Sequence, residues 1–500
     1  MEVLISTLSL LLALTLTLLY TAKATKRRRA SLPPGPLPLP LIGNLHQLGS
    51  EPHKSIAKLA EIHGPIMTVQ LGQVTTVVIS SASAAKQVLQ KQDHLFANRG
   101  VPDAIRACDH AEMSLPWIHL SPKWRDLRKV CNAEIFSYRK MQESEHLRWR
   151  KIHEMVADVG ASASAPRGEA VVVAEVGFKT MLNLMSSLLM SVDLDQPGSE
   201  LGREFEQSFM SILKIAGAPN LVDCYPWMER FDPQRIRARM TPHFADMLSF
   251  VDSQISQRLS HRAENGSDSV DTDVLDNLLN IVQDESQEIT RADIKHLILD
   301  LFVAGTDTTS TILEWAMSEM IRNPLIMLKA KAELARTVDK GKQVKDSDIQ
   351  HLPYLQAIVK ESLRLHPVIP LLLPRKVLTD LELSGYTLPK DTKVLINAWA
   401  IGRDPETWAS PDEFDPERFL GSEVDVKGAH FELIPFGSGR RVCVGMPLAN
   451  RMLHLMLGSL VNCFDWGLEG GAKAEELDMS DVFGIGLQKA KHLRAVPIVV

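Results

Sequence analysis

The sequence has little cysteine, few aromatic residues and no strong excess of one charge. Among 500 residues there are only 5 cysteines, an odd and sparse number that excludes a scaffold stapled by disulfides. The formal net charge of −6, from 55 basic and 61 acidic residues, gives no electrostatic reason to expect a nucleic acid partner. Hydrophobic residues nevertheless make up 45% of the chain, which excludes a disordered protein and allows a large core.

Several common site motifs are also absent. The sequence contains no HExxH zinc motif, no CxxC pair and no GxxxxGK phosphate-binding loop. Gly437 and Gly439 begin a GxGxxG pattern, but Val442 stands where the third glycine is required. We therefore do not expect a zinc protease, a P-loop enzyme or a protein with its own dinucleotide site.

Long apolar runs are missing from most of the chain, but one lies near its start. Residues 3–22 are uncharged and rich in leucine, and a helix of that length spans roughly 30 Å of hydrocarbon. Basic residues follow this run and give the first thirty residues a local charge of +4. In a cleaved signal peptide the basic residues come first, so this order favours a retained anchor and predicts a cytosolic body.

A proline-rich stretch, SLPPGPLPLPLIGN, follows at residues 31–44. Proline fixes φ and removes backbone donors, so we expect a stiff, extended connector. The sequence thus predicts a membrane anchor at residues 1–22, a basic collar and proline-rich hinge at 23–44, and one large domain at 45–500.

The large domain is predicted to be mainly α-helical with small β-sheets. Apolar residues recur at helical spacing in 54–62, 124–136, 171–192, 205–215, 240–259, 274–282 and 290–321. Two strand groups interrupt them, a hairpin at 66–71 and 75–79, and a second group at 381–388 and 392–397.

The segment FGSGRRVCVG, residues 436–445, carries the strongest chemical signal. A cysteine in a glycine-rich loop at a helix start is stabilised as thiolate by backbone N–H groups. The segment matches FxxGxRxCxG at every specified position and resembles the haem-ligand loop of the cytochrome P-450 monooxygenases. The resemblance implies the cytochrome P-450 fold, with Cys443 as axial ligand of the haem iron, Arg441 on a haem propionate and Phe436 beside the sulfur. Val444 departs from the proline usual in plant relatives.

A second signal lies in the helix predicted at 290–321. Gly305 costs about 1 kcal/mol of helix stability relative to alanine, and we expect close approach of a ligand to repay it. The segment AGTDTT, residues 304–309, resembles the oxygen-activation motif of the same family. The resemblance implies that Asp307 and Thr308 relay protons. The alternative is that the Thr308 hydroxyl only bonds its own i−4 carbonyl.

Other residues take roles from the same resemblance. Glu361 and Arg364, with Arg418 of the PERF segment, resemble the family's buried structural cluster. Trp124, Arg128 and Arg375 resemble its propionate contacts. The basic helix that carries Arg125 and Lys129 is similar in position to the surface where an acidic reductase docks.

The resemblance also implies the lining of a substrate pocket. Its members are Ile105, Trp117, Ile118, Leu301, Phe302, Ala304, Ile369, Leu371, Leu373, Phe483 and Ile485. Such a lining favours an apolar substrate that is placed by shape. Asp103, Asp109 and Glu112, in the same loop as Ile105, leave open a cationic amine.

The sequence around residues 373–405 and 431–443 looks most like that of plant microsomal enzymes related to geraniol hydroxylase and to diterpene oxidases. This resemblance implies haem b as cofactor, electrons from NADPH through a reductase partner, a lipophilic terpenoid substrate, and single-pass anchoring in the endoplasmic reticulum membrane. Oxidation of a benzylisoquinoline alkaloid or a phenolic compound is the alternative. Two other classes remain, a haem protein that only transfers electrons or binds a ligand, and a peroxide isomerase that needs no reductase.

Overall fold

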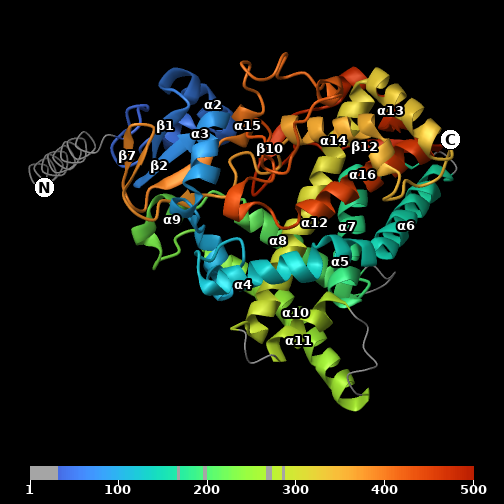
Figure 1. Ribbon diagram of the computed structural model, residues 1–500, viewed down its shortest axis with the longest axis horizontal. Coiled ribbons are helices and arrows are strands. Elements are labelled where there is room, and N and C mark those ends of the chain that lie inside the picture. The colour runs from blue at the N-terminus through green and yellow to red at the C-terminus, as the bar shows by residue number, and fades with distance from the viewer. Residues whose placement is uncertain (1–31, 166–168, 195–199, 266–272, 284–287) are drawn as a thin grey trace, which may run out of the picture.

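The computed structural model describes residues 32–500 except 166–168, 195–199, 266–272 and 284–287, and it is mainly helical (Figure 1). The principal helices are α2 (Pro52–His63), α4 (Pro122–Val130), α6 (Glu145–Ala163), α7 (Val173–Met190), α8 (Glu200–Ala216), α10 (Ile236–Asn265), α11 (Val274–Gln283), α12 (Arg291–Arg322), α13 (Pro324–Thr337), α14 (Pro353–Leu365) and α16 (Met446–Cys463). Shorter helices are α3 (Ala82–Lys86), α5 (Tyr138–Glu143), α9 (Leu221–Cys224) and α15 (Ala398–Ile401).

The largest sheet has five strands in the order β1-β2-β8-β5-β3. Its strands are β1 (Ile66–Leu71), β2 (Val74–Ile79), β3 (Asn98–Arg99), β5 (Arg375–Lys376) and β8 (Lys393–Ile396). The predicted hairpin is confirmed as the antiparallel pair β1 and β2, and β8 joins β2 in parallel. The other strands are β4 (Val171–Val172), β6 (Leu381–Leu383), β7 (Tyr386–Leu388), β9 (Phe464–Leu468), β10 (Asp481–Phe483), β11 (Leu487–Lys489) and β12 (Arg494–Val499).

The proline-rich segment contacts this sheet. The carbonyl of Pro34 accepts a 2.7 Å hydrogen bond from the Thr68 amide, and Gly43 forms a bridge to Leu71. A side chain at Gly35 would collide with the Thr68 carbonyl, because a Cβ there would lie 1.9 Å from that oxygen. Residues 34–43 are thus packed against β1.

Helix α12 is 32 residues long and lies at the centre of the fold (Figure 1). It begins with the expected capping box, in which the Thr290 hydroxyl and the Asp293 carboxylate each accept from the other's backbone amide. It packs along α7 and α16, and one large hydrophobic cluster runs through all three helices.

One predicted helix starts later than its pattern indicated. Helical spacing began at residue 171, but Val171 and Val172 form strand β4, which pairs with Ala495 and Arg494 of β12. These β-branched residues fit a strand, and a partner more than 300 residues away cannot be read from local periodicity.

The expected anchor, residues 1–22, lies outside the described residues. In the part of the chain that the structure does describe, no helix combines the length and apolar character needed to cross a membrane.

Candidate active site

The glycine-rich loop places Cys443 at the start of α16. Its amide donates to the Phe436 carbonyl at 3.0 Å, and the amides of Gly445 and Met446 donate toward its sulfur. Burial raises the pKa of the thiol, whereas these amides and Arg128 act in the opposite direction. The side chain is nevertheless accessible to water. A group that protein surrounds and water still reaches faces an internal space, so the sulfur is presented to a cavity.

Gly439 lets this loop lie close to its neighbours. Its φ is +70°, and a Cβ would lie only 1.9 Å from the carbonyl oxygen of Leu89. Glycine is therefore required here both for the backbone conformation and for the close approach. Arg440 and Arg441 follow it directly and point to different partners.

Four arginines gather beside the loop: Arg99, Arg128, Arg375 and Arg441. Burial is the main cause that lowers the pKa of each guanidinium, and Arg375 and Arg128 further lower the pKa of Arg441, to about 9. The Arg375 Nε atom is buried without a hydrogen-bond partner. So much buried positive charge is costly unless anionic groups join it. The cluster is therefore suited to bind a ligand with negative charge.

Arg99 is a site residue that the sequence did not indicate. It lies directly opposite Arg375 in the antiparallel pair of β3 and β5, and donates to the carbonyls of Pro116 at 3.0 Å and Leu373 at 2.9 Å. Like charges at opposed strand positions are destabilising, so no pairing rule would have placed these two together.

The segment 114–118 connects the cysteine loop to α12. Arg441 donates to the carbonyls of Leu115, at 3.2 Å, and Ile118. On the other side, Asp300 of α12 accepts from the Leu115 amide at 2.8 Å and from the Ser114 hydroxyl at 2.6 Å. The cysteine loop, this segment and α12 therefore enclose one site.

On α12 the side chain of Ala304 is exposed although most of the helix is buried. Exposure in the middle of a central helix indicates that Ala304 faces an internal space. The explanation expected for Gly305 is corrected. A Cβ at Gly305 would meet the Met185 sulfur of α7 at 3.3 Å, so tight helix packing accounts for the glycine.

The two predicted relay residues have different surroundings. Asp307 is buried, accepts a 3.0 Å hydrogen bond from Gln488 Nε2, and has a pKa that desolvation raises to about 6. Thr308 is half-buried, and its hydroxyl donates to the Ala304 carbonyl at 2.7 Å. This is the i−4 bond of the alternative interpretation. It leaves the lone pairs of the hydroxyl oxygen free to accept a hydrogen bond.

The structural cluster has the expected geometry. Glu361 is fully buried and accepts from Arg364 at 2.6 Å and from Arg418 at 3.0 Å. Arg364 also donates to the carbonyls of Gly402 and Pro411. These contacts bind α14 to the segment before the cysteine loop.

The predicted pocket residues divide into two groups. Ile105, Trp117, Ile118, Leu301 and Phe302 belong to the large hydrophobic cluster, with Ile369, Leu373 and Ile485 packed against it. Leu371 and Phe483 instead join a separate cluster with α2 and the five-stranded sheet. Phe302 is fully buried against Phe205 of α8, so it presents no surface to a cavity.

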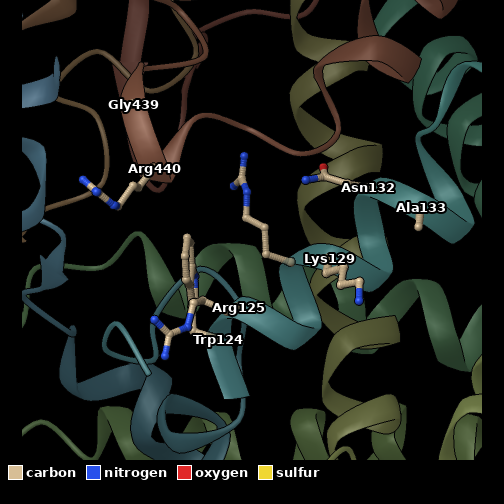
Figure 2. Close-up of a pocket in the computed structure, with 8 residues that line it drawn as sticks. Trp124, Arg125, Lys129, Asn132, Ala133, Gly439 and Arg440 are labelled. Atoms are coloured by element: carbon tan, nitrogen blue, oxygen red, sulfur yellow. The ribbon is translucent and has the colours of Figure 1, made fainter. Parts of the chain in front are cut away.

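A surface pocket of about 640 Å³ lies where α4 meets the cysteine loop (Figure 2). Its lining consists of Trp124, Arg125, Arg128, Lys129, Asn132, Ala133, Gly439 and Arg440. Trp124 is buried, and the Arg441 guanidinium lies over its ring at 4.6 Å. The pocket is strongly basic, with Arg125 and Lys129 exposed on α4.

Cys443 and the buried arginines beside it fit a haem group with a thiolate ligand. A single cysteine thiolate at a helix start, beside buried arginines, is the donor set that a haem group takes in proteins with a thiolate ligand. Two propionates would neutralise part of the arginine cluster and give Arg375 Nε a partner. When bound, haem supplies the activation of dioxygen.

Comparison with known proteins supports this fit. The cytochrome P-450 family model matches residues 33–493. The chain is 51% identical over 466 residues to a geraniol 8-hydroxylase of Catharanthus roseus, covering 93% of this chain and 94% of the relative. It is 49% identical over 468 residues to a 7-ethoxycoumarin O-deethylase of Helianthus tuberosus, covering 93% and 94%.

A solved zebrafish cytochrome P-450 structure with progesterone superposes with a TM-score of 0.77 at 25% identity, covering 89% of this chain and 99% of that one. The cysteine loop, the anion-binding arginines and both kinds of comparison agree. The chain belongs to the cytochrome P-450 family and is a plant haem-thiolate monooxygenase that receives electrons of NADPH from a reductase.

Proposed function

We propose that the enzyme hydroxylates a lipophilic terpenoid of mono- or diterpene size. The apolar character of the predicted pocket carries this proposal, since Ile105, Trp117, Ile118 and Leu301 share one hydrophobic cluster. A wall of this kind selects by shape and excludes charged groups. The relative that bears the name geraniol 8-hydroxylase supports a monoterpene alcohol as the first compound to test.

The acidic residues of the first pocket loop argue against a cationic amine. Asp103 is buried and forms a 3.2 Å ion pair with Arg237, so its charge is already matched. Glu112 lies 4.0 Å from Arg106, and Asp109 is exposed. An alkaloid substrate therefore has less support than a neutral phenolic one, for which the 7-ethoxycoumarin O-deethylase relative gives a specific compound.

Residues on both sides of the site take distinct roles in this proposal. Cys443 ligates the iron, and Phe436 packs beside it. Propionate binding is assigned to Trp124, Arg128, Arg375 and Arg441, and we add Arg99 because it lies opposite Arg375. Thr308 and Asp307 deliver protons, and a pKa of about 6 allows Asp307 to exchange a proton near neutral pH.

The basic pocket beside α4 is the proposed docking surface for the reductase. Arg125 and Lys129 are exposed there, whereas Arg440 pairs with Asp93. Attraction between this surface and an acidic partner depends on ionic strength, because exposed charges are screened by salt.

Membrane attachment is proposed through residues 1–22, with the domain from residue 45 in the cytosol and residues 23–44 between them. Exposed apolar side chains on the described surface support attachment. Leu41, Trp227 and Phe231 are 59%, 61% and 71% exposed. The Tyr225 hydroxyl donates to the Leu41 carbonyl, which brings these two segments near each other. Such a patch favours an interface with lipid.

The test is a titration of the Soret band with geraniol, 7-ethoxycoumarin and a benzylisoquinoline amine, followed by product analysis with reductase and NADPH. We expect geraniol to displace the haem water and to be hydroxylated. A response confined to the amine would contradict the terpenoid proposal. Cys443→Ala should abolish the red-shifted band of the reduced carbon monoxide complex, and its survival would contradict the assigned ligand.

A further inference from the structure

Strand β11 (Leu487–Lys489) lies along α12 at the level of Asp307. The Leu487 carbonyl accepts a 3.4 Å hydrogen bond from Trp315 Nε1, and the Lys489 ammonium lies 4.7 Å from the centre of the Trp315 ring. Gln488, between them, points to the other face of the strand, as alternation in a strand requires. Its side chain reaches Asp307.

The position of the Asp307 carboxyl group depends on its hydrogen bond with Gln488. Gln488 Nε2 donates to Asp307 Oδ1 at 3.0 Å, and among the hydrogen bonds of the described residues it is the partner of that carboxyl group. The second oxygen, Oδ2, has none from the described side chains. Thr308, the next residue, directs its hydroxyl to the Ala304 carbonyl instead.

We propose that Gln488 is a positioning residue, which holds Oδ1 of the Asp307 carboxyl group by a hydrogen bond and so leaves Oδ2 for the exchange of protons. This inference rests on the proposed relay and deepens it. The amide of Gln488 donates to the carboxyl group and accepts nothing from it in this arrangement, so it favours the ionised form of Asp307.

The charged groups around Asp307 are few. His492, which follows β11, is the charged residue whose field also lowers its pKa. His492 itself is paired with Glu314 of α12 at 3.1 Å, and Glu175 of α7 acts on it as well. Lys489 lies on the opposite face of β11, over Trp315. Desolvation therefore raises the pKa of Asp307, and the hydrogen bond from Gln488 does most to lower it.

The inference is tested by infrared titration of the haem-loaded, full-length enzyme. The protonated carboxyl group of Asp307 gives a band that Asp307→Asn removes, which assigns it. In the wild type this band should titrate near pH 6. Gln488→Met keeps the volume but removes the donor, so the midpoint should rise by about one pKa unit.

Two further variants complete the test. Gln488→Glu places a second carboxyl group against Asp307 and should raise the midpoint more than Gln488→Met does, because two nearby carboxylates resist joint ionisation. Trp315→Phe is the matched control. It removes the Nε1 bond to the Leu487 carbonyl and keeps the Gln488 side chain, so it should lower thermal stability and leave the midpoint unchanged.

The outcomes are separable. An unchanged midpoint in both Gln488 variants, or an equal shift in Trp315→Phe, would overturn the positioning role. A titrating band that persists in Asp307→Asn would overturn it too, since the acid would be another group. Failure of the relay itself would instead appear as normal coupling of oxygen to product in Asp307→Asn, whatever the infrared result.

Discussion

Asp300 and Asp307 lie two turns apart on the same stripe of α12 and are equally buried, at 8% and 7% exposure. Asp300 accepts from Ser114 at 2.6 Å, from the Leu115 amide at 2.8 Å, and lies 3.1 Å from His110 Nε2. Asp307 accepts from Gln488 alone among the described side chains. A carboxylate that accepts from several donors is held in one position by them, whereas a carboxylate with a single donor keeps one oxygen open to other partners.

The comparison separates two uses of a buried acid on one helix. Asp300 binds the segment 114–118, which carries predicted pocket residues and lies against Arg441. It therefore determines where that wall of the site stands. Asp307 connects only to β11 and keeps the chemical freedom that a relay requires. Five predictions test how far this division holds.

Asp300→Ala should have the largest effect. It leaves His110 Nε2, the Ser114 hydroxyl and the Leu115 amide without their acceptor, and each buried donor left unsatisfied costs about 1–3 kcal/mol. We expect this loss in the free energy of unfolding, measured by urea denaturation. Asp300→Asn keeps one acceptor oxygen and should lose less. If Asp300→Ala were as stable as Asp307→Asn, the proposed structural role would be wrong.

Asp307→Asn should raise the free energy of unfolding above pH 6, whereas Asp300→Ala lowers it. The pKa of Asp307 is raised from 3.8 to about 6, so the folded state binds the proton more tightly than the unfolded state. The folded wild type is thus destabilised as pH rises from 3.8 to 6, by about 3 kcal/mol at 1.36 kcal/mol per pKa unit. The difference in unfolding free energy between wild type and variant should follow this slope and stay constant above it.

His296 provides the contrasting pH dependence near Asp300. Its ring lies 2.7 Å from that of His110, and burial lowers its pKa to about 4. Stability from a base with a lowered pKa is present above the unfolded value of 6.5 and is lost as pH falls toward 4. As the pH falls, His296 should therefore lower the free energy of unfolding. Over part of the same range, protonation of Asp307 should raise it.

In turnover, substitution of Asp307 should have a larger effect than substitution of Asp300. Asp307→Asn removes the exchangeable proton, so hydroxylated product should fall by about 10²-fold, the lower range for general acid–base catalysis, while peroxide release rises. The measurement is product and peroxide per NADPH, with reductase and the compound that gives the largest Soret shift. Asp300→Asn, as the control, should keep the ratio of product to peroxide. Equal ratios in the two variants would remove the distinction.

The sequence indicated the residues that belong to short motifs, but not the residues whose partners lie far away in the chain. Short motifs with fixed spacing indicated Cys443, Glu361 and Asp307 as candidate residues, and the capping box located the start of α12. Arg99 and Gln488 were missed because each meets its partner across more than 170 residues, with no periodicity to connect them. Asp300 had a signal that was overlooked. A charged residue among apolar neighbours on a buried stripe requires partners, and Asp293, His296, Asp300, Asp307, Thr311 and Glu314 form such a polar line along α12.

Two adjacent threonines extend the comparison to a smaller effect. Thr308 and Thr309 both donate to their i−4 carbonyls, at 2.7 Å and 3.2 Å, but Thr308 lies beside the exposed Ala304 whereas Thr309 is buried. The same hydrogen bond is therefore made by one threonine beside the cavity and by one threonine in the core.

Thr308→Ala should raise the fraction of NADPH lost as peroxide by roughly tenfold, with haem and substrate binding unchanged, because the hydroxyl beside the cavity is lost. Thr309→Ala removes the same chemical group from the core and should lower stability only. Thr308→Ser keeps the hydroxyl and should restore coupling. If both alanine variants uncouple alike, the i−4 bond and not the relay explains the threonine.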